Sequence, residues 1–174
     1  EKSRSDDTKI EVYNNGVWTT VVTGFTIEPA YCSQVSLGGI EGNKIRITFK
    51  NPQAAQSASL YEIECTGLAV SGSESKENPD SNVFADRTAD QIALGNGSVH
   101  AGAGPLTAVF DGKLDTRFAL AGAPAYATLE ITLDGAAPLY TMAIYPFYQG
   151  DTVSRSDNTK IEVYVDGVWI TVVT

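Results

Sequence analysis

Residues 160–173 read KIEVYVDGVWITVV, two runs of strand-forming residues separated by Asp166-Gly167. In the first run Ile161 and Val163 alternate with other residues, which places both side chains on one face of a strand. Asp-Gly between two such runs is a strong signal for a tight hairpin turn, because both residues tolerate positive φ. This stretch therefore predicts a β-hairpin.

The same hairpin occurs twice in the chain. Residues 3–23 read SRSDDTKIEVYNNGVWTTVVT and residues 154–174 read SRSDNTKIEVYVDGVWITVVT, so 17 of 21 positions match at an offset of 151 residues. The first copy has Asn15-Gly16 at the turn, which serves the same turn chemistry. Two interpretations stay open: a strand pair duplicated inside one domain, or a window cut from nearly identical domains in tandem or from subunits that repeat each other's ends. A period this long is the size of a whole domain rather than of a solenoid repeat, which favours the second.

Other segments of the chain show the same alternation of apolar and polar residues. The predicted strands are 44–49, 60–65, 128–133 and 140–145. Asp134-Gly135 predicts a turn after the third of these, and no helix is expected beyond a single turn near 87–93. Many short strands joined by Gly-rich turns predict an all-β fold, an antiparallel sandwich or jelly roll.

The composition excludes several classes of function. Apolar residues make up 43% of the chain, enough for a core. With 12 Lys+Arg against 21 Asp+Glu, the net charge of −9 disfavours a nucleic-acid partner. No apolar run approaches the roughly 20 residues of a membrane helix. A single histidine, His100, stands outside any nucleophile motif, and neither a Cys/His zinc set nor a nucleotide-binding loop is present, so we expect no enzyme.

Three parts of the sequence stand out: residues 109–118, residues 129–133 with 161–169, and residues 44–47 with 60–64. Together they resemble discoidin domains, also called coagulation factor 5/8 type C domains, which are galactose-binding-like and include the family 32 carbohydrate-binding modules. The first, VFDGKLDTRF at 109–118, is similar to the "DG-x-x-x-T-x-W" loop of that family. The second combines LEITL at 129–133 with IEVYVDGVW at 161–169, similar to the "IEVS-x-DG-x-W" hairpin. The third combines KIRI at 44–47 with LYEIE at 60–64, similar to the "RYVRI…EIEV" ending. The resemblance implies a jelly roll, an extracellular location and non-catalytic binding.

The order of these stretches is broken relative to the family. Residues 1–70 resemble the C-terminal half of one domain, residues 84–174 resemble the N-terminal half of the next or of the same domain permuted, and the polar residues 71–83 read as a linker. The two halves can close on each other as a permutant, which leaves one hairpin surplus. Alternatively, each half completes itself with a neighbouring chain, as in strand exchange.

The resemblance also implies a structural Ca²⁺, which needs six to eight oxygen ligands. The matching oxygens come from the side chains of Asp111, Thr116 and Glu62 and from the carbonyls of Ala108, Lys113 and Tyr61. Because Glu62 and Asp111 lie in different halves, the site forms only where the halves meet. The alternative is a tight turn in which Asp111 and Thr116 merely bind backbone N–H groups.

Carbohydrate sites of the family use loop residues at one end of the sandwich. The candidates here are His100, Tyr148, Arg155 and Asn158, with the alternative that each is an ordinary solvated loop residue. Trp18, Trp169 and Phe118 match positions that the family buries, so we expect them in the core.

Cys32 and Cys65 are the only cysteines. Two cysteines in an extracellular type of domain predict a disulfide between them. The family's usual bridge joins the two ends of the domain, so this bridge would be non-standard. Asn96-Gly97-Ser98 is a glycosylation sequon.

The sequence therefore predicts a non-catalytic extracellular repeat module whose partners are neighbouring copies of the same repeat, and possible glycans. Such modules would build a tandem or self-assembling surface structure, namely a stalk, a filament or an adhesin for cell adhesion. The alternative is a lectin-like carbohydrate-binding module attached to a larger secreted glycan-active enzyme.

Overall fold

A computed structural model describes residues 5–27, 32–50, 59–67, 81–95, 98–99, 104–121, 126–146, 161–165 and 168–173. The strands are β1 (Ser5–Asn14), β2 (Val17–Ile27), β3 (Ser33–Lys50), β4 (Ser59–Gly67), β5 (Ser81–Asn82), β6 (Ile92–Leu94), β7 (Ser98–Val99), β8 (Phe118–Ala121), β9 (Tyr126–Pro146), β10 (Ile161–Val165) and β11 (Val168–Val173). Within these ranges the only helical segments are the 3-10 turns η1 (Ala89–Gln91) and η2 (Leu106–Phe110). The predicted all-β antiparallel fold is confirmed, and η1 lies where a single turn was expected.

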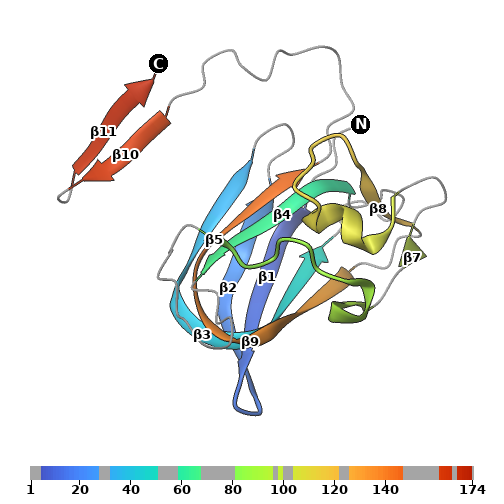
Figure 1. The fold of residues 1–174 in the computed structure, drawn as a ribbon. Helices are drawn as coiled ribbons and strands as arrows, with labels where there is room; N and C mark the ends of the chain where they lie inside the picture. The colour runs from blue at the N-terminus through green and yellow to red at the C-terminus, as the bar shows by residue number, and fades with distance from the viewer. Residues whose placement is uncertain are drawn as a thin grey trace.

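Nine strands form one curled sheet in the order β2-β1-β3-β9-β4-β8-β7, with β5 paired to β4 and β6 paired to β9. Strand β9, from the second half of the chain, lies between β3 and β4, which come from the first half (Figure 1). Residues 5–67 and 81–146 therefore interlock in one sheet of a single chain.

The long strands β3 and β9 bend together and carry the sheet around the core. Their pairing register shifts between Ser36 and Ile40 and again between Gly42 and Lys44. Gly38 supplies left-handed backbone at the first shift, with φ of 72°. Such irregularities let a strand pass from one layer to another. Accordingly, the first part of β9 pairs with β6 and its last part pairs with β4.

The turn predicted at Asp134-Gly135 is wrong, because β9 runs through it. Asp134 instead holds two side chains from the segment around η1. Its Oδ2 accepts a hydrogen bond from Arg87 Nη2 at 3.2 Å, and its Oδ1 accepts one from Gln91 Nε2 at 2.6 Å. The strand bends at this point and does not reverse, since β3 stays paired with it on both sides.

The end of the predicted linker 71–83 also belongs to the sheet. Residues 68–80 lie outside the described part, but Ser81–Asn82 form β5 and Val83 is buried. Asn82 Oδ1 accepts hydrogen bonds from the backbone N–H groups of Cys65 and Phe84, both at 3.0 Å. One amide thus fastens the second half of the chain to β4.

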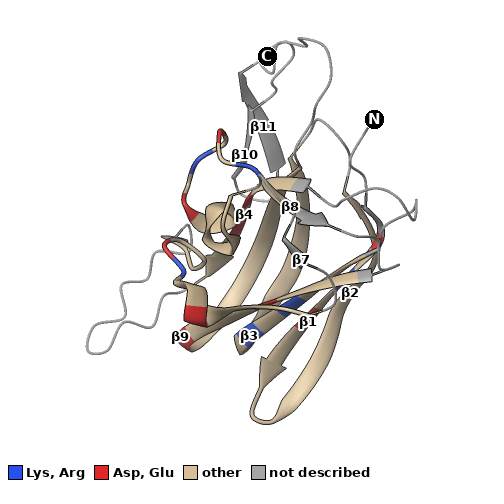
Figure 2. Cartoon of the chain, turned by 90° about the vertical axis from the view of Figure 1, so that its right-hand side faces the viewer, with Lys and Arg blue, Asp and Glu red and all other residues tan. Residues whose placement is uncertain are grey.

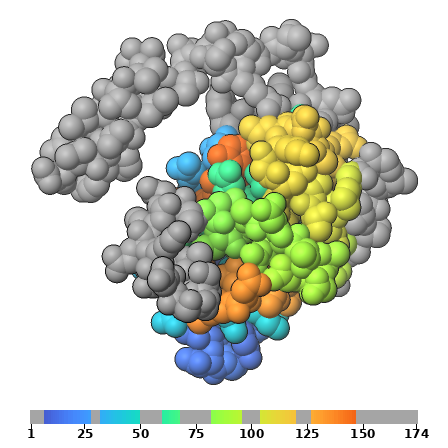
Figure 3. All heavy atoms as spheres, in the orientation of Figure 1, coloured from blue at the N-terminus to red at the C-terminus, as the bar shows by residue number. Residues whose placement is uncertain are grey.

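Alternation along the strands builds the core. The residues buried to 2% exposure or less include Ile10, Val12, Ile45, Ile47, Phe49, Ile63, Cys65, Phe84, Phe110, Phe118, Leu129, Ile131, Leu139, Met142 and Ile144. Phe84 and Phe110 meet edge to face, with 5.8 Å between ring centroids. Their segments, 81–95 and 104–121, lie side by side over one face of the molecule (Figure 3), joined by a hydrogen bond of 3.0 Å from Asp86 N to Phe110 O.

The two copies of the repeated hairpin have different surroundings. In β1–β2 the first strand pairs with β3, whereas β10–β11 form a separate two-stranded sheet (Figure 1). Their internal registers match at the offset of 151. Tyr13 pairs with Trp18 and Tyr164 pairs with Trp169, and both copies have an irregularity after the strand's isoleucine. The sequence repeat is thus also a repeat of backbone structure.

Candidate functional site

Glu62 is a buried carboxylate that connects β4 to the loop after η2. A register irregularity in the β4–β9 pairing lies just before it, so Glu62 and its neighbour Ile63 are both buried, at 1% and 0% exposure. Glu62 Oε2 accepts a hydrogen bond from Gly112 N at 3.1 Å. Its other oxygen, Oε1, is buried and has no hydrogen-bond partner among the residues that the structure describes. An unpartnered buried carboxylate oxygen is costly, so this atom requires an explanation.

The loop after η2 brings a second carboxylate to the same place. Asp111 caps η2, and its Oδ1 accepts a hydrogen bond from Lys113 N at 2.9 Å. Gly112 between them has φ of 71°, a conformation that glycine adopts without cost and that aims its N–H at Glu62. Asp111 therefore binds a backbone N–H group in a tight turn, as the alternative to a calcium site predicts. The same turn also binds the carboxylate of Glu62, which comes from the other half of the chain.

The environment raises the pKa of Glu62 to about 7. Burial is the main cause, and the negative charge of Asp111 is the second. Hydrogen bonds from the backbone of Gly112 and Lys113 oppose the rise. The site thus holds two carboxyl groups that repel each other when both are ionised, a condition that a bound cation would relieve.

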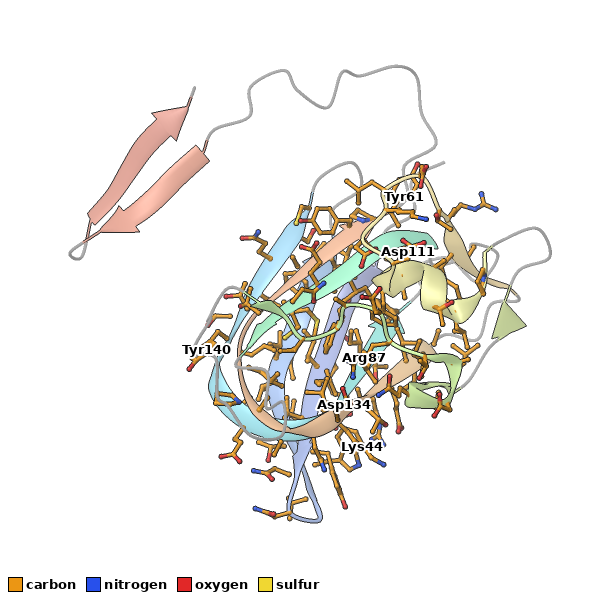
Figure 4. All side chains as sticks on the ribbon, viewed as in Figure 1. Lys44, Tyr61, Arg87, Asp111, Asp134 and Tyr140 are labelled. Atoms are coloured by element: carbon orange, nitrogen blue, oxygen red, sulfur yellow. The ribbon has the colours of Figure 1, made fainter. Side chains whose placement is uncertain are left out.

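The other expected calcium ligands come from the same loop and strand as this pair, or from η2. Ala108 is buried in η2, Lys113 is exposed in the loop, and Tyr61 and Asp111 lie at the same end of the molecule (Figure 4). Thr116 Oγ1 donates a hydrogen bond to Asp115 Oδ1 at 3.3 Å rather than joining Asp111. Among the described residues, no group of three or more His, Cys, Asp or Glu gathers at one point. The side chains therefore offer two carboxylates, and further oxygens would have to come from the backbone.

A second feature, which sequence reasoning missed, is a network of charged and aromatic side chains on the outer face of the sheet. Arg46 on β3 lies at its centre. Its Nη2 is 2.8 Å from Glu130 Oε1 and its Nη1 is 3.7 Å from Glu11 Oε2. Its guanidinium lies over the Trp18 ring, 3.9 Å from the centroid. Basic and acidic positions accordingly alternate across β1, β3 and β9 (Figure 2).

This network corrects the expectation for Trp18, which is half-buried on the outer face and not in the core. Its ring centroid lies 5.2 Å from that of Tyr13, and Lys44 lies 5.8 Å over the Tyr13 ring. Phe118 was expected in the core and is confirmed there at 1% exposure. The side chain of Trp169 lies outside the described part of the structure.

The predicted disulfide is not formed: Cys32 and Cys65 are both free thiols. Cys65 lies on β4 in the core, where burial raises its pKa to about 12. Cys32 precedes β3 on the far side of β9 and is exposed. Two strand spacings of about 4.8 Å separate β3 from β4, more than a disulfide spans.

Cys32 instead belongs to a small polar cluster on the outer face. The Tyr145 hydroxyl donates a hydrogen bond to Glu64 Oε2 at 3.1 Å. Burial raises the pKa of Tyr145, and Cys32 and Glu64 beside it raise the pKa further. Although Cys32 is exposed as a residue, partial desolvation of its thiol likewise raises its pKa, so neither cysteine is poised as a thiolate.

The expected carbohydrate contacts His100, Tyr148, Arg155 and Asn158 lie outside the described residues, as does the sequon at Asn96. None of these predictions is therefore placed in the fold. Comparison with known proteins gives no match to a family model, a curated protein or a solved structure.

Proposed function

We propose that this chain is a non-catalytic repeat module with a discoidin-like jelly-roll fold, which builds a tandem or self-assembling extracellular structure such as a stalk, filament or adhesin. One observation carries the proposal: a hairpin that completes the sheet at the start of the chain recurs 151 residues later with the same internal register. All nine strands of the large sheet come from residues 5–146, so one period of 151 residues would hold one unit and its connection to the next.

The chemistry of the described residues supports a non-catalytic role. The pKa values of both thiols are raised, which makes them poor nucleophiles. Of the perturbed carboxyl groups, Glu62 is buried and is bound to the backbone of the loop after η2. In the described segments no helix has the length and apolar character of a membrane span.

A structural calcium ion belongs to the same proposal. Glu62 and Asp111 would hold it with carboxylate oxygens, and Ala108, Lys113 and Tyr61 would add carbonyl oxygens, with Thr116 as a further donor. The unpartnered Glu62 Oε1 and the mutual repulsion of the two carboxyl groups support the fit. The ion would lock β4 to the loop after η2 and so join the two halves of the chain, because calcium prefers such all-oxygen sets.

Electron microscopy of the native material, with and without a calcium chelator, tests the proposal. We expect regular assemblies with a repeat of about one domain, and a loosened or lost repeat after chelation. Dispersed particles under both conditions would overturn the assembly function. A glycan-binding screen would then test the lectin-like alternative. Asp111→Asn serves as the matched control for the chelator, because it should weaken the calcium site without removing calcium from the solution.

A further inference from the structure

The edge of β3 from Lys44 to Lys50 is a docking site for a hairpin, here called the hairpin seat. In the structure β1 occupies it, through the antiparallel pairs that run from Asp6↔Lys50 to Tyr13↔Lys44. Gly42, just before the seat, fixes the approach. A Cβ built on Gly42 would lie 2.1 Å from Val12 Cγ1 and 2.9 Å from the Tyr13 carbonyl oxygen. Only a strand that fits this close approach can dock there.

The second hairpin carries the same contact set. The six β1 residues that pair with β3 are Asp6, Lys9, Ile10, Glu11, Val12 and Tyr13, and their counterparts at the offset of 151 are identical in type. Trp18, which stacks on Arg46, recurs as Trp169. The β1 residues that pair with β3, and the tryptophan that lies over Arg46, therefore all recur in the second hairpin.

The four positions that differ between the copies avoid the seat. They are Asp7, Asn14, Asn15 and Thr19, replaced by Asn158, Val165, Asp166 and Ile170. Three of the first-copy residues are exposed, one is half-buried, and none pairs with β3. Asp7 and Asn15 have φ of 60° and 48°, a conformation that both Asn and Asp tolerate. The other two changes, to valine and isoleucine, raise β-propensity.

The second hairpin is also tethered to the unit that holds the seat. Residues 147–160 separate β9 from β10, and a chain of this length spans at most about 50 Å. That reach exceeds the roughly 35–40 Å diameter of a compact unit of this size. Exchange within one chain costs no association entropy, which favours it over exchange between chains.

From these observations we propose that the hairpin seat accepts β10–β11 of the same chain in place of β1–β2. The chain then has two arrangements with one sheet and one spare hairpin each. In the first arrangement the spare hairpin follows β9, and in the second it precedes β3. An isolated two-stranded hairpin is only marginally stable in water, so both copies compete for the same seat.

In a tandem array, and resting there on the function proposed above, this exchange changes the joint between units. In such an array each hairpin stands between the β9 of one unit and the β3 of the next. If the hairpin pairs with the β3 that follows it, residues 147–160 connect the two units. If it pairs with the β3 of the preceding unit, only the residues that correspond to 28–32 connect the two units. Backward seating would therefore shorten and stiffen the joint, because short connectors restrict the relative motion of domains.

Cysteine reporters in the full chain test the exchange. In a Cys32→Ser background, Lys9→Cys with Thr48→Cys reports the first hairpin in the seat, because these positions are paired. Lys160→Cys with Thr48→Cys reports the second. After mild oxidation of dilute protein, peptide mass spectrometry measures the disulfide in each. We expect an intrachain disulfide in both variants.

A matched tryptophan pair shows that the two reporters share one seat. Trp18→Ala should shift the ratio toward the second reporter by about two- to fivefold, from the loss of the cation–π contact with Arg46. Trp169→Ala should shift it by a similar factor in the opposite direction. An intrachain disulfide in the first reporter alone, or a ratio that neither tryptophan change moves, would overturn the proposal.

The origin of the docking hairpin is read from an equal mixture of a Lys160→Cys chain and a Thr48→Cys chain. Exchange within one chain predicts little covalent dimer in this mixture under the conditions in which the Lys160→Cys/Thr48→Cys chain forms its intrachain disulfide. Covalent dimers at a comparable yield would contradict exchange within one chain. Because all reporters are read on dispersed chains, failure of the exchange stays distinct from failure to form assemblies in the microscope.

Discussion

The buried carboxyl of Glu62 makes stability depend on pH in a direction opposite to that of most acidic residues. Its pKa is raised from 4.5 to about 7 in the folded chain, mainly by burial and next by Asp111. The folded state therefore holds the proton more tightly than the unfolded state does. This contribution to stability is intact below about pH 4.5 and is lost as the pH rises through about 7. A shift of this size corresponds to roughly 3 kcal/mol, at about 1.4 kcal/mol per pKa unit.

Glu62→Gln removes this dependence, because the amide keeps an acceptor for Gly112 N and does not ionise. Urea unfolding in the presence of a chelator, at pH 5 and at pH 8, measures it for both chains. We expect the difference in unfolding free energy between variant and wild type to move by about 2–3 kcal/mol in favour of the variant between the two pH values, because a part of the full effect is already lost at pH 5. Asp111→Asn should show a smaller shift of the same sign, since it removes only the second cause. Parallel pH profiles for wild type and Glu62→Gln would show that Glu62 does not titrate with a raised pKa in the folded chain.

Four further outcomes are expected. Calcium at 100 times its dissociation constant should stabilise the wild type at pH 7.5 by about 2.7 kcal/mol and Glu62→Gln far less, as measured by thermal unfolding; equal shifts would place the ion elsewhere. Arg46→Ala should lower the free energy of unfolding, measured in urea, by about 1 kcal/mol, because it removes the contacts with Glu130 and Trp18. Arg46→Lys should recover only part of this loss, because lysine lacks the planar guanidinium group. Gly42→Val should destabilise the fold by about 1–3 kcal/mol, because its side chain would collide with β1. Hydrogen exchange should show that residues 5–27 lose amide protection selectively. A uniform loss of protection would contradict a role of Gly42 in the docking of this hairpin. A thiol reagent should label Cys32 in the native chain and Cys65 only after denaturant is added, and native labelling of Cys65 would contradict its burial.

The local elements could be predicted from the sequence, because alternation and turn residues are local signals. Strands at 44–49, 60–65, 128–133 and 140–145 all occur, and so does the hairpin turn at Asn15-Gly16. The failed turn at Asp134-Gly135 depended on context. There β3 is paired with β9 on both sides of the bend, and Arg87 and Gln91 bind Asp134. Turn propensity alone does not include such partners.

The candidate site was predictable in part for the same reason. The resemblance brought Glu62 and Asp111 together across the two halves, and the structure places them beside each other. The Arg46 network was missed although Glu11, Arg46 and Glu130 each stand between buried apolar residues. Alternation indicates that all three face outward, but which strands are neighbours depends on long-range pairing. The disulfide failed on the same ground, because β9 lies between the strands that hold or adjoin the two cysteines.

The central claim is that one repeat unit closes within one chain, with β9 of the second half between β3 and β4 of the first. Amide hydrogen exchange of the full chain, measured over a hundredfold dilution, tests this most directly. If the sheet forms within one chain, residues 33–50 and 126–146 should be strongly protected, and their protection should not change with protein concentration. Protection that falls on dilution, or that differs in kind between the two halves, would show that each half is completed by a neighbouring chain.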